Sequence, residues 1–300
     1  MRYSMFNWLL RKDPSFKKRL LGINERNARY IYPNNARKHY KLADDKCITK
    51  SILENNDLAC PKTYTVIRRL GDIERLWNQV KNHHSLVIKP SKGRGGDGIK
   101  VLFKKDDTWF QGNQEISEDL IFSHIANVIF GVYSFGNSDK AIIEERIVSH
   151  PFFHQIYDTG VPDIRIIVYK GTIVMAMLRV PTKKSNGKAN LHQGGLGIGI
   201  NLKTGKLTHT YDGKKYIEYH PDSKSEIRGL EIPFWKDLLL LSITASKHFP
   251  LDYLGVDLVI DETKGPMIME VNVRPGLGIQ LANKKGLKRI LMNSRWETIS

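Results

Sequence analysis

Two cysteines, Cys47 and Cys60, are all that the 300 residues contain, and they form no CxxC pair. So few thiols argue against a disulfide framework and against a structural zinc site. The sequence therefore fits a protein of the reducing cytoplasm.

Long hydrophobic runs and several catalytic signatures are also missing. No segment approaches the roughly 18–20 apolar residues of a membrane span, and the first residues, MRYSMFNWLLRKD, do not resemble a secretory signal. The absence of GxSxG and HExxH argues against common hydrolases. His150, His154 and His192 are scattered without metal-binding spacing. Without an RGG tract, zinc finger or RRM signature, nucleic acid is not expected as the main ligand.

Basic residues are in excess and are concentrated at the start of the chain. The net charge is +16, and residues 1–40 hold ten Lys or Arg against two Asp or Glu, half of that total. Such a segment could contact a membrane surface or an acidic substrate. It could equally be a solvated basic face beside a nucleotide site, and the sequence leaves these alternatives open.

Stretches with strand character alternate with stretches of helical periodicity. Asp44 is placed to cap a helix running to about Asn56. Helical patterns are found at 72–83, 117–130 and 233–250, and strand patterns at 85–90, 99–103, 140–148, 163–169, 172–181, 253–261 and 266–273. This mixture predicts an α+β or α/β fold.

A glycine-rich segment, LVIKPSKGRGGDGIKV, connects two of the predicted strands. Lys89 ends the first strand, and Gly93, Gly95, Gly96 and Gly98 follow it. Glycines let backbone N–H groups approach phosphate oxygens, and a lysine adds positive charge. The segment is not a Walker A loop, since no Gly-Lys-Ser/Thr opens a helix. A simple hairpin with a flexible tip remains an alternative.

Three oxygen-bearing side chains fall on two adjacent predicted strands near the end of the chain. Glu270 and Asn272 are two residues apart and therefore share a face, while Asp257 lies on the preceding strand. Hard oxygen ligands of this kind suit Mg²⁺. Alternatively, Glu270 pairs with a basic residue on the same face of the sheet.

A third group combines arginines with a carboxylate and a polar loop. Asp163 and Arg165 share one strand face, Arg179 ends the next strand, and Lys188 and Asn190 follow in the loop. Arginine binds phosphate or carboxylate oxygens through two parallel bonds. An ordinary salt bridge between Asp163 and one arginine is the alternative.

Taken in order, these pieces resemble a known superfamily. The segments DDK, VIKPSKGRGGDGI, IIEERI, DIR, NLHQGG and GVDLV…MEVNVRPG resemble the ATP-grasp superfamily, and within it the RimK-like glutamate ligases, over about 42–291. The leading stretch, LLGINERNARYIYPNNARKHYKLADDK, further resembles proteins labelled alpha-L-glutamate ligase-like or sugar-transfer-associated ATP-grasp.

The resemblance implies an α+β fold in which two subdomains clasp ATP, preceded by a short N-terminal helical segment. The expected division is a basic segment at 1–41, an ATP-grasp domain at 42–291 with subdomains 42–147 and 148–291, and a tail at 292–300. Two features depart from the pattern of the RimK-like glutamate ligases. Only 45 residues precede Lys46, and residues 148–162 form an insertion. The substrate can therefore not be inherited by analogy.

The resemblance also implies roles for individual residues. The catalytic arginines would be Arg179, which would stabilise an acyl phosphate, and Arg165. The magnesium ligands would be Asp257, Glu270 and Asn272. The ATP-binding residues would be Lys46, Lys89, Ser91, Gly95, Gly96, Glu144, Glu145, Ile147, Asp163, Lys188 and Asn190.

The activity implied is that of an ATP-dependent carboxylate–amine ligase with ATP and Mg²⁺ (or Mn²⁺) as cofactors. ATP would convert a carboxylate into an acyl phosphate, which an amine then attacks. The expected substrates are amino acids or peptides, including acidic ones such as glutamate. The alternative is a non-catalytic ATP-binding scaffold in an envelope-associated system.

Overall fold

The computed structural model of the chain describes residues 14–93 and 95–293. They fall into two compact units: a large unit formed by Met1–Ala43 and Val148–Ser300, and a small unit formed by Asp44–Ile147. The chain thus leaves the large unit after its first segment and returns to it after the small unit. The first 13 residues of the expected N-terminal helical segment lie outside the described residues.

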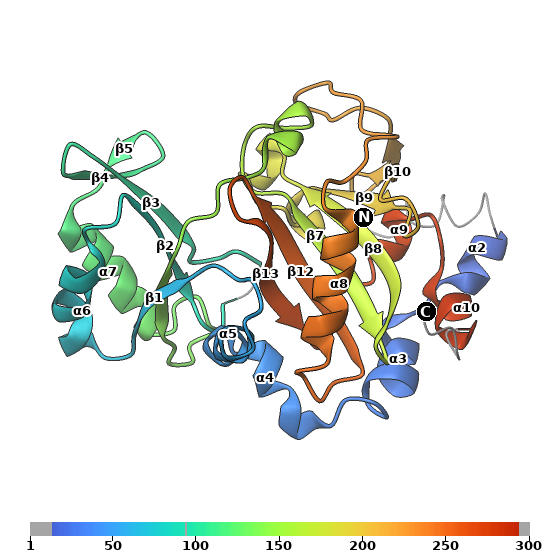
Figure 1. The fold of residues 1–300 in the computed structure, drawn as a ribbon, viewed down its shortest axis with the longest axis horizontal. Helices are drawn as coiled ribbons and strands as arrows, with labels where there is room; N and C mark the ends of the chain where they lie inside the picture. The colour runs from blue at the N-terminus through green and yellow to red at the C-terminus, as the bar shows by residue number, and fades with distance from the viewer. Residues whose placement is uncertain (1–13, 94, 294–300) are drawn as a thin grey trace. The chain divides into compact units, whose positions relative to one another are not determined.

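The large unit is built on one antiparallel sheet with strand order β11-β10-β9-β8-β7-β12-β13. Its strands are β7 Asp163–Tyr169, β8 Thr172–Val180, β9 Leu196–Ile200, β10 Leu207–Tyr211, β11 Tyr216–Ile217, β12 Tyr253–Asp261 and β13 Gly265–Asn272. Its helices are α2 Pro14–Arg19, α3 Ile23–Arg26, α8 Trp235–Ser246, α9 Ile279–Ala282 and α10 Leu287–Asn293. The helix α8 packs against β7, β12 and β13 (Figure 1).

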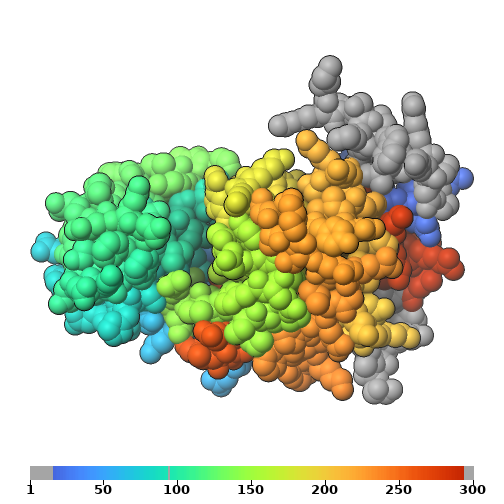
Figure 2. Space-filling view, turned by 90° about the horizontal axis from the view of Figure 1, so that it is seen from above, coloured from blue at the N-terminus to red at the C-terminus, as the bar shows by residue number. Residues whose placement is uncertain are grey.

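One face of this sheet is charged at one end and apolar at the other. Along β7, Asp163 and Arg165 share a face with Ile167, because side chains alternate along a strand. The apolar end belongs to a buried cluster that includes Leu21, Tyr30, Ile31, Ile167, Met175, Met177, Tyr253, Leu287 and Leu291. Segments from both ends of the described chain thus complete one core, and they lie side by side in Figure 2.

The small unit is a second antiparallel sheet, with strand order β1-β6-β2-β3-β4-β5. Its strands are β1 Thr63–Ile67, β2 Ser85–Pro90, β3 Lys100–Lys105, β4 Thr108–Gln111, β5 Gln114–Glu115 and β6 Ala141–Glu144. Its helices are α5 Lys46–Asn55, α6 Ile73–Val80 and α7 Glu118–Ile129, and α4 Lys41–Asp44 leads into it.

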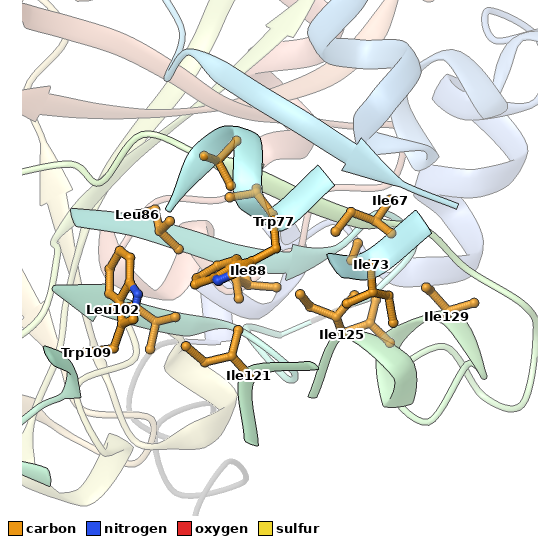
Figure 3. Close-up of a cluster of buried hydrophobic side chains, with 14 of the residues drawn as sticks. Ile67, Ile73, Trp77, Leu86, Ile88, Leu102, Trp109, Ile121, Ile125 and Ile129 are labelled. Atoms are coloured by element: carbon orange, nitrogen blue, oxygen red, sulfur yellow. The ribbon is translucent and has the colours of Figure 1, made fainter. Parts of the chain in front are cut away.

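The main core of the small unit lies between one face of its sheet and the helices α6 and α7. Ile88 of β2 and Ile143 of β6 point into this core, where Trp77 is fully buried (Figure 3). Lys89 and Glu144, one residue further along each strand, must therefore point to the opposite face. Lys50 of α5 contacts Glu144, so this helix lies on that opposite face.

The predicted alternation of strands and helices is confirmed, and so is the mixed α+β class. The helix predicted from Asp44 begins one residue later, since Asp45 is its N-cap and its carboxylate accepts bonds from the N–H groups of Cys47 and Ile48. No helix in the part of the chain that the structure describes is both long and apolar enough to cross a membrane.

Candidate functional site

The glycine-rich loop of the small unit connects β2 and β3, two strands that the sequence predicts. Lys89 lies near the end of β2, and Gly95, Gly96 and Gly98 in the turn that follows have φ values of 67°, 80° and 76°. This left-handed region is costly for residues with a Cβ atom. The loop can therefore present backbone N–H groups at close range to an anion.

Lys89 is one member of a buried ionic group on the face opposite the core. Its Nζ lies 2.5 Å from Oε1 of Glu144, and Nζ of Lys50 lies 2.6 Å from Oε2 of the same carboxylate. The side chains of Lys89, Lys50 and Glu144 are 5%, 6% and 2% exposed. Lys50 also donates a short hydrogen bond to the carbonyl of Pro61. One buried carboxylate thus orients two ammonium groups.

The charge of Glu144 is stabilised by this arrangement. Burial would raise the pKa of Glu144, but Lys89 and Lys50 together lower it below its ordinary value. Both carboxylate oxygens already accept a bond from an ammonium group. The role of Glu144 in ATP binding stays a prediction.

The start of the glycine-rich loop is tied to the N-terminus of α5. Ser91 Oγ donates to Oδ1 of Asp45 at 2.6 Å, and Lys46 Nζ donates to the Gly93 carbonyl at 2.8 Å. Lys140 Nζ donates to the other oxygen of Asp45 at 3.1 Å. Burial would raise the pKa of Asp45, but the bonds from Ser91 and Lys140 lower it. The two predicted residues Lys46 and Ser91 therefore meet at the first turn of the loop.

The end of the loop is held by α7 and the segment after it. The Gly98 carbonyl accepts from His124 Nε2 at 3.0 Å, and His124 Nδ1 lies 3.4 Å from the Tyr133 hydroxyl. Because a carbonyl only accepts, Nε2 carries the proton and Nδ1 accepts. Burial and Lys100 lower the pKa of His124 to about 4, so the ring is neutral at pH 7. A Cβ at Gly98 would lie 2.5 Å from the Tyr133 ring.

The remaining predicted nucleotide contacts of the small unit follow β6. Glu145 donates its N–H to the Lys62 carbonyl at 2.9 Å, and its Oε2 accepts from the Lys62 N–H at 3.3 Å. Ile147 is 8% exposed. Their roles in ATP binding stay predictions.

In the large unit, β7, β8 and β12 bring the predicted arginines and aspartates together. Arg165 binds Asp257 through two bonds, from Nε to Oδ1 at 2.7 Å and from Nη2 to Oδ2 at 2.6 Å. Arg179 donates from Nη2 to Oδ2 of Asp257 at 2.7 Å and to Oδ2 of Asp163 at 2.6 Å, and from Nε to Oδ1 of Asp163. The expected salt bridge of Asp163 is therefore one part of a four-residue network.

Strand register explains why these four side chains meet. Asp163 pairs with Arg179 across β7 and β8, and Asp257 pairs with Arg165 across β12 and β7. Directly opposed residues of an antiparallel pair have side chains on the same face. Burial would raise the pKa of Asp257, but the two arginines lower it to about 2.

The three predicted magnesium ligands also share this face. Glu270 pairs with Asp257 across β12 and β13, and Asn272 Nδ2 donates to Oδ2 of Asp257 at 3.1 Å. Because the side-chain nitrogen of Asn272 donates that bond, the side-chain oxygen Oδ1 is the atom left to bind a cation. Among the residues that the structure describes, no group of three or more His, Cys, Asp or Glu side chains could hold a metal ion. The predicted set has two carboxylates and one amide, and its role stays a prediction.

The loop that follows β13 is held close to this face by the N-terminal segment. A Cβ at Gly255 would lie 2.6 Å from the Pro275 side chain, so only glycine allows this approach. Arg26, whose side chain is buried, donates from Nη1 to the Pro275 carbonyl at 2.7 Å. The basic N-terminal segment thus positions a loop directly beside Asn272, which the sequence did not predict.

Lys188 and Asn190 lie in the loop between β8 and β9. Asn190 caps the short helix η6 (Leu191–Gln193), and its Oδ1 accepts from the His192 N–H at 3.0 Å. A Cβ at Gly195 would lie within 3.1 Å of both Asn190 and the Val180 carbonyl, so this loop folds back on the end of β8. The nucleotide contacts expected of Lys188 and Asn190 are predictions.

The insertion at 148–162 packs within the large unit. Its start is bound by Asp261, whose Oδ2 accepts from the Val148 N–H at 3.0 Å. Its end contacts a distant loop, since Tyr157 stacks on His220 and the Ile156 carbonyl accepts from Ser223 Oγ at 2.6 Å. A surface hollow of about 320 Å³ lies there.

Several residues with clear structural roles at these sites were not predicted. Lys50 lies one helical turn after Lys46, and this i, i+4 spacing was the available signal. The residues that hold the two loops have no local signal, because their partners are distant in sequence; they are Asp45, His124 and Tyr133 for the glycine-rich loop and Arg26 for the loop after β13.

Curated relatives resemble parts of this chain. The cyanophycin synthetase of Synechocystis sp. is 25% identical over 83% of this chain and 29% of its own length. A protein named "Probable alpha-L-glutamate ligase" from Psychromonas ingrahamii is 32% identical over 44% of this chain and 33% of its own length. The matches thus span about a third or less of these relatives.

Among solved structures, the D-alanine–D-alanine ligase from Bacillus anthracis is 18% identical, with a TM-score of 0.47 over 84% of this chain and 65% of that protein. The model of the family described as sugar-transfer associated ATP-grasp matches residues 25–295. This match confirms the resemblance found in the sequence, and the chain belongs to the sugar-transfer associated ATP-grasp family.

Proposed function

We propose that this chain is an ATP-dependent carboxylate–amine ligase that forms an amide bond through an acyl phosphate. The observation that carries the proposal is the charged face of the large unit, where Asp257, Glu270 and Asn272 lie beside Arg165 and Arg179. Such a face combines oxygen donors for a hard cation with guanidinium groups for anionic oxygens. Family membership supports the same activity.

The donor atoms of the face fit a magnesium ion. Oδ2 of Asp257 accepts three of the bonds described, whereas Oδ1 accepts one, so Oδ1 retains a lone pair for a cation. We assign this oxygen, the Glu270 carboxylate and the Asn272 carbonyl oxygen as the protein ligands. When bound, Mg²⁺ would neutralise phosphate charge; Mn²⁺, which prefers similar ligands, would substitute for it.

The arginines have two tasks in this proposal. Through Nε and Nη2, Arg165 and Arg179 hold Asp257 and Asp163 in one orientation. The Nη1 group of each arginine takes no part in these bonds. We propose that Nη1 of Arg179 donates to the acyl phosphate and that Nη1 of Arg165 donates to an oxygen of the transferred phosphoryl group.

The small unit supplies the groups expected to bind the nucleotide. Backbone N–H groups of the loop from Ser91 to Gly98 would bind the phosphates, and Lys46 and Lys89 would add positive charge. Because Lys89 shares the Glu144 carboxylate with Lys50, its ammonium is held in place before ATP arrives. The adenine would contact the backbone between Glu144 and Ile147.

In the reaction, a substrate carboxylate attacks the γ-phosphate of ATP and releases ADP. An amine then attacks the acyl carbon, and phosphate leaves. Phosphoryl transfer depends on positioning and on charge neutralisation, which the described lysines and arginines supply. We propose amino acids or peptides as substrates, with acidic ones such as glutamate as the first to test, because two of the relatives above bear the names of cyanophycin synthetase and glutamate ligase.

The test is release of ADP that requires both a carboxylate and an amine. We expect Glu270→Gln to abolish turnover with little loss of ATP affinity, and Lys89→Ala to weaken ATP binding, while the exposed control Lys105→Ala changes neither. Losing one electrostatic contact of this kind costs roughly 10²–10³ in rate. ATP binding without amine-dependent ADP release across a panel of acidic amino acids and peptides would instead indicate a non-catalytic scaffold.

A further inference from the structure

Helices from the two ends of the described chain are joined in the large unit. The helix α2 contacts α10, and a Cβ at Gly286 would lie 2.0 Å from the Arg19 carbonyl. The buried Gln280 links the two segments, since its Oε1 accepts from the N–H groups of Leu21 at 2.8 Å and Leu287 at 2.9 Å. The pairing of Lys288 with Glu25 at 2.7 Å brings α3 beside α10 as well.

The outer side chains of these helices and of the turn before α10 are mostly basic. We call them the terminal platform; its basic residues are Lys17, Lys18, Arg19, Lys285, Lys288 and Arg289. Within α2, α3 and α10 the only acidic residue is Glu25, which also lies 3.8 Å from Arg29. The platform therefore has a strong positive charge contributed by both ends of the described chain.

Apolar side chains are exposed among these charges. Ile23 on α3 is 64% exposed and Met292 on α10 is 62% exposed. In the sequence, MRYSMFNWLLRKD precedes α2 and SRWETIS follows α10; both lie outside the described residues. Basic residues interspersed with tryptophan, phenylalanine and aliphatic residues are typical of segments that bind the interface of an anionic bilayer.

The platform is separate from the charged end of the sheet face in the large unit. It covers the apolar end of the sheet face, where Leu21, Leu287 and Leu291 pack against Met175, whereas the carboxylates and arginines occupy the other end. Its charges are therefore not part of the proposed magnesium site. A polyanion in solution would match the lysines but would leave Ile23 and Met292 without an apolar partner.

We propose that the terminal platform docks on an anionic lipid bilayer. Lipid phosphates would contact its lysines and arginines, and Ile23 and Met292 would enter the boundary between headgroups and acyl chains. The aliphatic stems of the basic side chains would lie along the same boundary. The large unit would then meet the bilayer with the apolar end of this sheet face, while the end with the carboxylates and arginines stays open to substrates.

The experiment is co-sedimentation of the full chain with vesicles of phosphatidylcholine, with and without phosphatidylglycerol. We expect binding only when phosphatidylglycerol is present. A fourfold variant replaces the platform's exposed charges by Gln: Lys17→Gln, Lys18→Gln, Lys285→Gln and Arg289→Gln. It should weaken vesicle affinity roughly 10²–10³-fold, because each basic residue near an anionic surface raises the affinity about fivefold. Binding should also fall as salt rises.

A matched control removes four exposed charges elsewhere. The variant Arg68→Gln, Arg69→Gln, Lys236→Gln, Lys247→Gln has the same net charge as the platform variant, and those residues are also exposed. If it lost as much binding as the platform variant, or if the wild-type chain did not bind phosphatidylglycerol vesicles, the proposal would be overturned. If the fourfold variant does not fold, two double variants replace it: Lys17→Gln with Lys18→Gln, and Lys285→Gln with Arg289→Gln. Each should lower the logarithm of the vesicle affinity by about half as much as the fourfold variant.

A second variant separates a bilayer from a soluble polyanion. Ile23→Ser with Met292→Ser should weaken vesicle binding, most clearly at higher salt, and should leave binding to heparin unchanged. If vesicle binding did not respond to the loss of these two side chains, the surface would be a site for soluble polyanions and the membrane proposal would be wrong. ADP release is expected to be unaffected by all of these variants, so the outcome is independent of the ligase assignment.

Discussion

Replacing Glu144 by Gln tests whether one carboxylate sustains the buried ionic group of the small unit. The substitution keeps the shape of the side chain but leaves the ammonium groups of Lys50 and Lys89 without a counter-charge, and those side chains are only 6% and 5% exposed. Removing one partner of a buried pair costs about 3–5 kcal/mol. We expect a loss of that size in the free energy of unfolding.

Lys50→Met should cost less, although it removes a charge from the same group. It removes the bonds from Lys50 to Glu144 and to the Pro61 carbonyl, but it leaves Glu144 and Lys89 as a neutral pair. Because no buried charge is left without a counter-charge, we expect a loss of only about 1.5–3 kcal/mol. In the double variant only Lys89 remains uncompensated. The combined loss should therefore fall short of the sum of the two single losses by about 1–3 kcal/mol.

The measurement is urea unfolding of the full chain followed by tryptophan fluorescence, since Trp77 and Trp109 lie in the core of the small unit. The control is Glu115→Gln, which alters an exposed carboxylate of β5 and should change stability by less than about 0.5 kcal/mol. Additive losses within about 0.5 kcal/mol, or a larger loss for Lys50→Met than for Glu144→Gln, would refute the reasoning.

Three further predictions concern the loops and the pH dependence. Gly98→Ala should weaken ATP binding and lower the free energy of unfolding by about 1–3 kcal/mol more than Gly112→Ala does. Both glycines have positive φ, but only at Gly98 would the new methyl group meet a ring. Equal losses for the two variants in urea unfolding would contradict this. Because the folded-state pKa of Glu144 is lowered, its stabilising effect is complete above its ordinary pKa and is lost as pH falls through the folded value. The difference in stability between wild type and Glu144→Gln should therefore narrow as pH falls below the ordinary pKa of about 4.5, and a difference that widened there would count against the ion pairs. Arg26→Met leaves the Pro275 carbonyl without its buried donor and should cost about 1–3 kcal/mol, whereas an unchanged melting temperature would show that this bond contributes nothing.

The charged face of the large unit could be largely predicted from the sequence. Its residues lie on strands with clear periodicity, so the two-residue spacing of Glu270 and Asn272, and of Asp163 and Arg165, already places each pair on one face. What the pattern could not give is the register between strands, which decides that Asp257 meets both arginines. That pairing depends on contacts across 78 and 92 residues.

The small unit shows the opposite case. Its glycine-rich loop and Lys89 are recognisable locally, but the partner of Lys89 is not. Glu144 comes from a different strand, and Lys50 comes from a helix on the sheet face that points away from the core. The predicted cap of that helix was one residue early, at Asp44 instead of Asp45. Adjacent aspartates offer the same capping chemistry, and only tertiary bonds from Ser91 and Lys140 distinguish them.

The link from Gln280 to Leu21 has a consequence for the order in which the chain folds. During synthesis, the small unit at Asp44–Ile147 is a continuous stretch that can complete its core as soon as it leaves the ribosome. The large unit must wait, because Leu21, Tyr30 and Ile31 pack against residues that are made much later, 259 positions after Leu21 in the case of Gln280. Contacts so distant in sequence form slowly. The first part of the large unit to be made should therefore be the last to become protected from proteases.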